Sequence, residues 1–241
     1  MTVSASTTAD ADAAAAANSR RATILIAVAG CLHALLFLLA YWLVSSTPGT
    51  EATDEELQTF YSSGDRRRLI VVGLYVMPFA GIAFLWFSVA LRAAIHARRE
   101  RVSELLAGMQ LASGILYVGL FFVAAAAISV MSVSMDYVQA RVDPMLAREL
   151  PQYGRALLVV FAMRMAAIFV FTTSRLGRVT GLLPRWFVVV GFLVGLFLLL
   201  SSSFSRVLVL VFPVWLLLLC AAVVWRRLRP EAPAPVRPPV G

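Results

Sequence analysis

The stretch LIVVGLYVMPFAGIAFLWFSVAL, residues 69–91, runs for 23 residues without a charged side chain. A helix needs about 20 predominantly apolar residues to cross the hydrocarbon core of a bilayer. The stretch is too long for a strand of a transmembrane barrel, and in lipid its backbone must satisfy its hydrogen bonds internally. We therefore expect a membrane-spanning helix over Leu69–Leu91.

Five further stretches have the same apolar character. They are Ala22–Ser45, Leu105–Ser132, Ala156–Thr173, Trp186–Ser203 and Val207–Trp225. Of the 241 residues, 61% are hydrophobic and 14% are charged, whereas an average soluble domain has about 25% charged residues. This composition excludes a water-soluble globular protein. We predict an all-α fold, a polytopic membrane helix bundle whose six transmembrane helices form one domain over residues 22–225.

The two ends of the chain differ from this apolar middle. Residues 1–21 contain mainly Ala, Thr, Ser and Asp, which favours a disordered N-terminus on the cytoplasmic side. Residues 226–241 are rich in Arg and Pro, and we expect them to form a cytoplasmic tail that is extended and of the polyproline type from Pro230 to Gly241.

All 21 basic residues are arginines, and the net charge is +8. They lie mostly at the ends of the apolar stretches, which is typical of membrane topology, so we expect no nucleic-acid partner. With the N-terminus inside, thirteen arginines lie in cytoplasmic segments and seven in outer segments. This ratio favours both termini in the cytoplasm, although the Arg66–Arg68 triplet then lies outside and argues against it. We predict a multi-pass protein of the inner (plasma) membrane, with the lipid bilayer as its partner.

In this topology the two longer outer loops are residues 46–68 and 133–155. In the first loop, Thr53 and Glu56 have the spacing of a capping box at a helix N-terminus. In the second loop, Asp143 precedes a proline, which is the usual order of an N-cap and a first helical residue. We expect a short surface helix in each loop, the second over Pro144–Leu150. The two helices either cover a vestibule or connect the spans and pack their apolar side down.

Arg164 is the most informative single residue, because it lies inside an apolar stretch. It follows Arg155 by nine residues, which places it roughly 13 Å deep at a rise of about 1.5 Å per residue. A guanidinium at that depth costs at least about 2.5–3.5 kcal/mol and by default faces the bundle interior or water. It either binds an anion or a lipid headgroup, or acts as a buried hydrogen-bonding residue between helices. Asp136, just beyond the third stretch, is its nearest candidate partner in a ligand-binding site. The other candidates are Tyr75, Tyr117, His33 and backbone carbonyls that lack a helical donor.

Sequence features of enzymes and of cofactor sites are absent. A bis-histidine haem needs two histidines within the membrane, but His96 lies in a basic loop and leaves His33 alone. The chain has no His-Glu-x-x-His motif, no Walker loop and no Gly-x-Ser-x-Gly motif. We therefore assign no catalytic residue, no metal ligand and no cofactor.

Small residues indicate where helices approach each other closely. Gly191 and Gly195 form a Gly-x-x-x-Gly step in the fifth stretch, and the run Ala124–Ala127 has the same character. The helix that contacts the Gly191/Gly195 face belongs either to this chain or to a membrane-protein partner, including a second copy in a homo-oligomer.

The C-terminal third carries a family resemblance. The segments RVTGLLPRW, residues 178–186, and VFPVW, residues 211–215, resemble an uncharacterised six-helix family of bacterial, actinobacterial integral membrane proteins. The resemblance implies a six-helix membrane fold and brings no activity with it.

Three functions follow from these observations. The first is a non-enzymatic accessory or interaction component, which predicts that Arg164 packs against its neighbours without a cavity. The second is a small transporter or a lipid- or anion-binding membrane protein, which predicts an outward-opening central cavity that reaches Arg164. The third, an intramembrane enzyme, is the least favoured because no polar cluster converges on one point.

Overall fold

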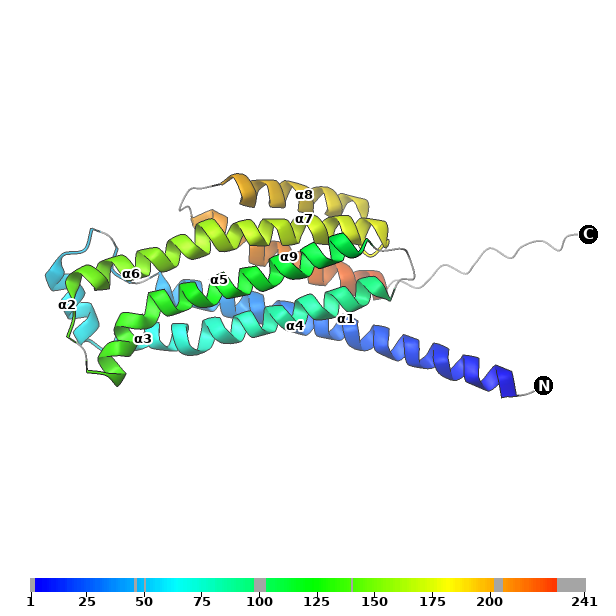
Figure 1. The fold of residues 1–241 in the computed structure, drawn as a ribbon, viewed down its shortest axis with the longest axis horizontal. Helices are drawn as coiled ribbons and strands as arrows, with labels where there is room; N and C mark the ends of the chain where they lie inside the picture. The colour runs from blue at the N-terminus through cyan, green and yellow to red at the C-terminus, as the bar shows by residue number, and fades with distance from the viewer. Residues whose placement is uncertain are drawn as a thin grey trace, which may run out of the picture.

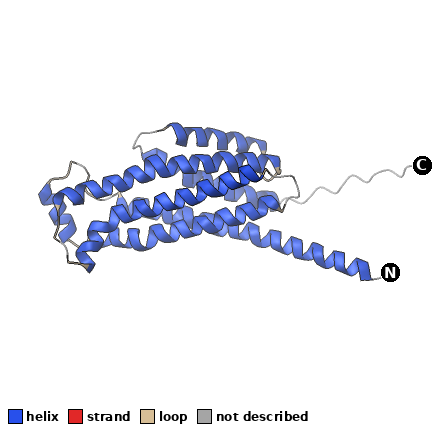
Figure 2. Ribbon diagram, viewed as in Figure 1, coloured by secondary structure: helices blue, strands red, loops and turns tan. Residues whose placement is uncertain are grey.

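The computed structural model describes residues 3–45, 47–49, 51–97, 103–139, 141–201 and 206–228. Every regular element in these ranges is helical (Figures 1 and 2). In chain order they are α1 (Val3–Val44), α2 (Asp54–Ser62), α3 (Arg66–Val71), η1 (Val72–Val76), α4 (Met77–His96), α5 (Glu104–Tyr137), α6 (Pro144–Ala156), η2 (Leu157–Ala162), α7 (Met163–Val179), α8 (Arg185–Leu200) and α9 (Arg206–Leu228). The elements η1 and η2 are π-helical. The all-α prediction is confirmed.

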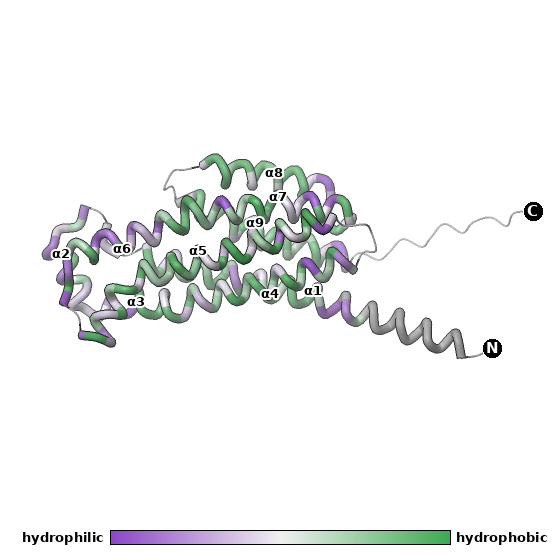
Figure 3. The backbone as a smooth tube through the Cα atoms, viewed as in Figure 1, coloured by the Kyte–Doolittle hydropathy of each residue, from purple (hydrophilic) through white to green (hydrophobic). Residues whose placement is uncertain are grey.

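Five helical segments are long and apolar enough to cross a membrane. Their bounds are Arg20–Val44, Arg66–His96, Glu104–Tyr137, Pro144–Val179 and Leu208–Arg226. Helix α8 is also apolar but has 16 residues, about 24 Å at 1.5 Å per residue. Hydrophobic residues dominate the middle of the bundle, and hydrophilic residues gather at its ends (Figure 3). The chain is therefore a multi-pass membrane protein by the length and composition of its helices.

The helices pack lengthwise against one another. α1 lies against α4 and α9, α5 lies against α4, α6 and α7, and α8 lies against α7. α2 is at the opposite end of the bundle from the start of α1 (Figure 1). The end formed by α2, the last turns of α5 and the first turns of α6 is called the α2 end below.

The first correction concerns the N-terminus. Residues 3–21 are helical and continue into the first span, because α1 begins at Val3, whereas the composition predicted disorder over residues 1–21. The physical reason is helix propensity. The segment contains Ala13–Ala17, and alanine is the residue that most favours a helix, even without tertiary packing.

The second correction concerns the start of the fourth span. Instead of a separate surface helix over Pro144–Leu150, α6, η2 and α7 form one continuous helical segment from Pro144 to Val179. Pro151 lies inside it and has no N–H, which leaves the carbonyl of Ala147 without its usual helical donor. Tyr61 Oη of α2 donates to this carbonyl at 3.4 Å. The helix therefore continues through a proline whose missing hydrogen bond another element replaces.

The predicted helix caps are confirmed. Thr53 Oγ1 accepts from the Glu56 N–H at 3.2 Å, and Glu56 Oε2 accepts from the Thr53 N–H at 2.8 Å, which completes the capping box of α2. Asp143 Oδ1 accepts from the N–H groups of Met145 and Leu146 at 2.9 and 3.3 Å. These caps were predictable because they depend only on residues within one turn.

Small residues bring other helices very close to α5. A Cβ atom at Gly73 would lie 2.0 Å from Ser129 Oγ, and one at Gly154 would lie 2.8 Å from the Ala124 carbonyl oxygen. Ala124 is buried, as is Ala125, so the predicted small-residue contact at this run is present. α5 therefore packs closely against η1 on one side and α6 on the other.

The Gly191/Gly195 step contacts α7 of the same chain. A Cβ atom at Gly191 would lie 2.0 Å from Ser174 Oγ, and one at Gly195 would lie 2.9 Å from the Phe171 ring. The sequence left open whether this face meets a helix of this chain or a partner. The contact with α7 answers that question for the single chain.

Candidate functional site

The four candidate ligand-binding residues lie in three separate places. His33 and Tyr117 contact each other in the core, Asp136 lies at the α2 end, and Arg164 is bonded to its own helix. The expectation that Asp136 is the nearest partner of Arg164 is wrong, because Asp136 forms an ion pair with Arg66. Asp136 and Arg66 are far apart in the chain. The spacing of residues along one helix could therefore not show which arginine lies next to the Asp136 carboxylate.

Arg164 satisfies part of its guanidinium with a backbone carbonyl. Its Nη1 donates to the carbonyl oxygen of Val160 at 2.9 Å, and the side chain is half-buried. Val160 belongs to η2, where the π-helical turn departs from the usual spacing of backbone hydrogen bonds. A charged side chain inside a membrane helix is thus bonded within its own helix, which reduces the cost of placing it there.

His33 belongs to the aromatic core. Its Nδ1 lies 2.8 Å from the Ala80 carbonyl oxygen, so this nitrogen carries the proton and donates. Its Nε2, 3.3 Å from Tyr117 Oη, then accepts from the tyrosine hydroxyl. The ring also lies against Phe84 and Phe37, with centroid distances of 5.0 and 6.0 Å. Both ring nitrogens have protein partners, which is the arrangement of a buried structural histidine.

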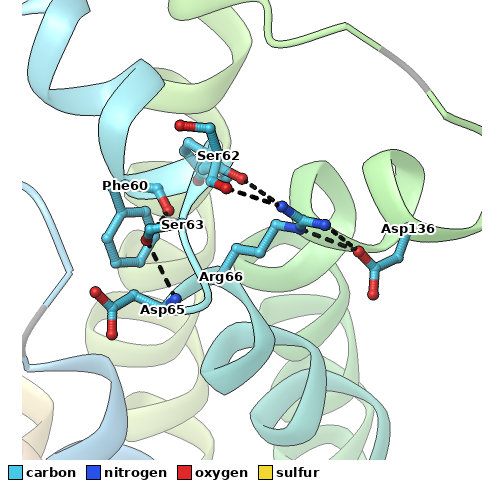
Figure 4. A network of polar contacts seen from close by, with 7 residues as sticks. Phe60, Ser62, Ser63, Asp65, Arg66 and Asp136 are labelled. Carbon is cyan, nitrogen blue, oxygen red and sulfur yellow. Dashed lines mark hydrogen bonds and ion pairs between the residues drawn. The ribbon is translucent and has the colours of Figure 1, made fainter.

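Asp136 is part of a bridge between α5 and α2. Arg66 donates from Nε and Nη2 to Asp136 Oδ1 at 3.0 and 2.8 Å (Figure 4). Its Nη1 donates to the carbonyl oxygens of Tyr61 and Ser62, at 3.0 and 3.5 Å. These carbonyls lie in the last turn of α2, where helical acceptors lack partners. One arginine therefore fastens the C-terminal end of α2 to the end of α5.

The turn between α2 and α3 has its own bonds. Ser63 Oγ donates to the Phe60 carbonyl oxygen at 2.8 Å and accepts from the Asp65 N–H at 3.2 Å (Figure 4). These bonds place Arg66 at the start of α3, directly after the turn.

A second arginine fastens the other end of α2. Arg148 of α6 donates from Nη2 to Asp54 Oδ1 and to the Ala52 carbonyl oxygen, both at 2.8 Å. Between the two bridges, Leu57 and Tyr61 are buried against the bundle. Helix α2 is therefore attached to the bundle by an arginine at each of its two termini and by its buried apolar side.

Burial raises the pKa of the Tyr61 hydroxyl, and the positive charge of Arg155 opposes the rise. The hydroxyl is therefore protonated at neutral pH, as its role as a donor to the Ala147 carbonyl requires.

A cavity of about 380 Å³ lies at the α2 end between α1, α5, the fourth span and α9. Its polar lining consists of Tyr41, Ser45, Thr47, Gln152 and Arg155. Its apolar lining includes Phe37, Ala40, Met77, Phe121, Leu158, Val159 and Val209. No carboxylate is found among its described lining residues, and Arg164 does not line it.

Among the residues that the structure describes, Arg155 is the one ionised group that lines this cavity. Its Nη2 donates to Thr47 Oγ1 at 2.9 Å, and the side chain is half-buried. Within the described part of the chain no ion pair involves Arg155, whereas Arg66 and Arg148 each lie 2.8 Å from a carboxylate oxygen. The cavity thus holds a positive charge that a neutral hydroxyl contacts but does not neutralise.

Sequence reasoning missed Arg155 and counted it only as an arginine of an outer loop. The available signal was helical spacing. Gln152, Arg155 and Val159 fall at i, i+3 and i+7, which places them on one face of a continuous helix. The expectation that the spanning helix begins at Ala156 concealed this face.

Comparisons of the chain with protein-family models, with curated proteins and with solved structures found no match. The interpretation of the cavity therefore rests on its geometry and chemistry.

Proposed function

We propose that this membrane protein binds an anionic group in the cavity at the α2 end, with Arg155 as the side chain that contacts the anion. The observation that carries the proposal is a half-buried guanidinium that lines a largely apolar cavity, with no carboxylate among the lining residues in the described part of the chain. A charge removed from water is costly unless it is paired. A guanidinium presents donors in a fixed fork that matches a carboxylate or a phosphate.

The proposal includes a topology with six spans, both termini in the cytoplasm and the α2 end outside. It is supported by the packing of the apolar α8 along α7 and by the excess of arginines in the segments that this topology assigns to the cytoplasm. The cavity then opens to the outer side of the inner membrane. Labelling of Glu55→Cys, but not of Arg178→Cys, by an impermeant thiol reagent in intact cells is expected. The reverse pattern would exclude this topology.

An accessory role without a ligand is the second candidate, and one observation favours it. Arg164 bonds to its own helix and does not line the cavity, as that role requires. The cavity beside Arg155 distinguishes the two candidates, because an accessory subunit has no need for an unneutralised arginine there.

The test compares Arg155→Gln with Arg141→Gln. Arg141 is an exposed arginine between α5 and α6 that does not line the cavity, so its replacement removes the same charge from the same end of the molecule. Each protein is reconstituted in phosphatidylcholine vesicles with and without phosphatidylglycerol, and the thermal unfolding midpoint is measured.

We expect the anionic lipid to raise the midpoint of the wild-type protein and of Arg141→Gln, because a ligand that binds only the folded state stabilises it. Arg155→Gln should lose most of this rise. An equal rise in all three proteins would show that the lipid acts on the general charge of the surface, and the proposed site would be excluded.

A further inference from the structure

We propose that the anion at Arg155 is the headgroup of an amphiphile whose single alkyl chain occupies the apolar part of the same cavity. This inference rests on the proposed function and names the class of its ligand. The ligand combines a phosphate or a carboxylate with a chain of about ten carbons.

The cavity has a polar end and an apolar end, and two walls show the same gradient. Along α1, Ser45 and Tyr41 lie toward the α2 end, and Ala40 and Phe37 follow toward the core. Along the fourth span, Arg155 is followed one turn later by Val159. The polar lining of both walls is therefore confined to the part of the cavity near the α2 end, where the apolar Val44 and Ile128 also line it, and the deeper lining is apolar.

The depth of the cavity sets the length of the chain. Phe37 of α1 and Ser45, the residue that follows the end of α1, are eight residues apart, which corresponds to about 12 Å at 1.5 Å per residue. An extended alkyl chain advances about 1.25 Å per methylene, since a C–C bond is about 1.5 Å long. A chain of roughly ten carbons therefore reaches from the polar lining to Phe37.

The end of the cavity is a stack of aromatic rings. Phe37 and Phe121 are stacked with a centroid distance of 5.7 Å and an interplanar angle of 19°. Phe121 stacks in turn on Tyr117 at 5.8 Å, and Tyr117 is held by its hydrogen bond to His33. These rings form a floor that limits the chain length. His33 and Tyr117 support the ligand site from below and do not contact the ligand.

Simpler ligands use only one end of the cavity. A free inorganic anion would pair with Arg155 but leave the apolar part of the cavity to water. Water binds poorly in a cavity with apolar walls because it finds few hydrogen-bond partners there. A neutral hydrocarbon would cover the walls and leave the guanidinium unpaired. An amphiphilic anion satisfies both ends at once.

The experiment measures how two alkyl phosphates bind to the full-length protein in a non-ionic amphipol. Methyl phosphate tests the headgroup alone, and decyl phosphate tests the headgroup with its chain. Ala40→Phe and Val209→Phe fill the apolar part from α1 and from α9, and Arg155→Gln removes the charge. Each result is the ratio of the Kd of a variant to the Kd of the wild type for the same phosphate, so partitioning of the probe into the amphipol cancels.

We expect a ratio near one for methyl phosphate with both filling variants. For decyl phosphate the ratio should reach tenfold or more, because each buried methylene contributes about fourfold to affinity. Arg155→Gln should weaken both phosphates by a similar factor. The smaller change Ala40→Leu gives an intermediate ratio and keeps the test usable if a phenylalanine variant does not fold.

Two results would overturn parts of the proposal. If the filling variants bind decyl phosphate as the wild type does while Arg155→Gln loses both phosphates, the chain does not enter the cavity and only anion binding stands. If Arg155→Gln binds both phosphates as the wild type does, the proposed function fails and the inference fails with it.

Discussion

Two pairs of arginines have opposite surroundings in this molecule. Arg66 and Arg148 each lie 2.8 Å from a carboxylate oxygen and fasten α2 to the bundle. Arg155 and Arg164, on the same continuous helical segment as Arg148, bond to a neutral hydroxyl and to a backbone carbonyl. The first pair is neutralised by the protein, and the second pair keeps its charge.

The difference separates structural arginines from a binding arginine. A guanidinium that lies beside a carboxylate has its charge neutralised, so its removal affects the element that it holds. An unneutralised guanidinium on a cavity wall can pair with an anion from outside. Arg164 belongs to neither group, because it donates to a backbone carbonyl and does not line this cavity.

The largest effect is expected where α6 approaches α5, since this contact positions both Arg148 and Arg155. Gly154→Val should lower the free energy of unfolding by about 3 kcal/mol, because a Cβ there would lie 2.8 Å from the Ala124 carbonyl oxygen and overpacking costs about 1–3 kcal/mol or more. An unfolding transition in neutral detergent measures this loss of free energy.

Gly119→Ala, on α5 with open space around it, serves as the control and should leave stability unchanged or slightly raised. Equal stabilities for Gly154→Val and the wild type would show that the helices are not in close contact.

The next effect compares one arginine of each pair in the absence of ligand. Arg148→Gln should lower the free energy of unfolding by about 1 kcal/mol, because Asp54 and the Ala52 carbonyl lose their donor. Arg155→Gln should change it by less than about 0.5 kcal/mol, since the lost bond to Thr47 is offset by the removal of an unpaired charge. The measurement is the same unfolding transition in neutral detergent. A larger loss for Arg155→Gln would make Arg155 a structural residue as well.

The smallest effect concerns the hydrogen bond that replaces the one missing at Pro151. Tyr61→Phe should lower the free energy of unfolding by about 0.5–1 kcal/mol, because the Ala147 carbonyl loses its donor. Burial raises the pKa of Tyr61 above its ordinary value of 10.0. Its contribution is therefore complete below about pH 10 and is lost as the pH rises through the folded pKa. Unfolding measured at pH 8 to 11 should show a steeper loss for the wild type than for Tyr61→Phe, and identical slopes would contradict the raised pKa.

Features set within one helical turn could be predicted from the sequence. The capping box of Thr53 and Glu56 and the N-cap at Asp143 lie where their spacing indicates. The apolar stretches likewise mark the helices, because hydrophobicity over about 20 residues decides membrane insertion.

Features that join distant segments could not be predicted in this way. Asp136 was expected near Arg164 but pairs with Arg66, which precedes it by 70 residues. Pro151 was expected to follow the end of a short helix, but Tyr61, 86 residues before Ala147, supplies the missing hydrogen bond. Arg155 was overlooked because its importance depends on walls contributed by other helices.

The π-helical segment η2 has a consequence for how the fourth span tolerates changes in length. Between Leu157 and Ala162 the backbone hydrogen bonds span one residue more than in an α-helix. The segment therefore takes up one extra residue, which in a regular helix would rotate the following part by about 100° around the axis. The face that carries Arg155 and the face of α7 that receives Gly191 and Gly195 thus have the relative orientation of a regular helix that is one residue shorter. Deletion of a single codon within this segment would therefore leave both faces directed at their neighbours, whereas deletion of a codon elsewhere in the span would turn one of them away.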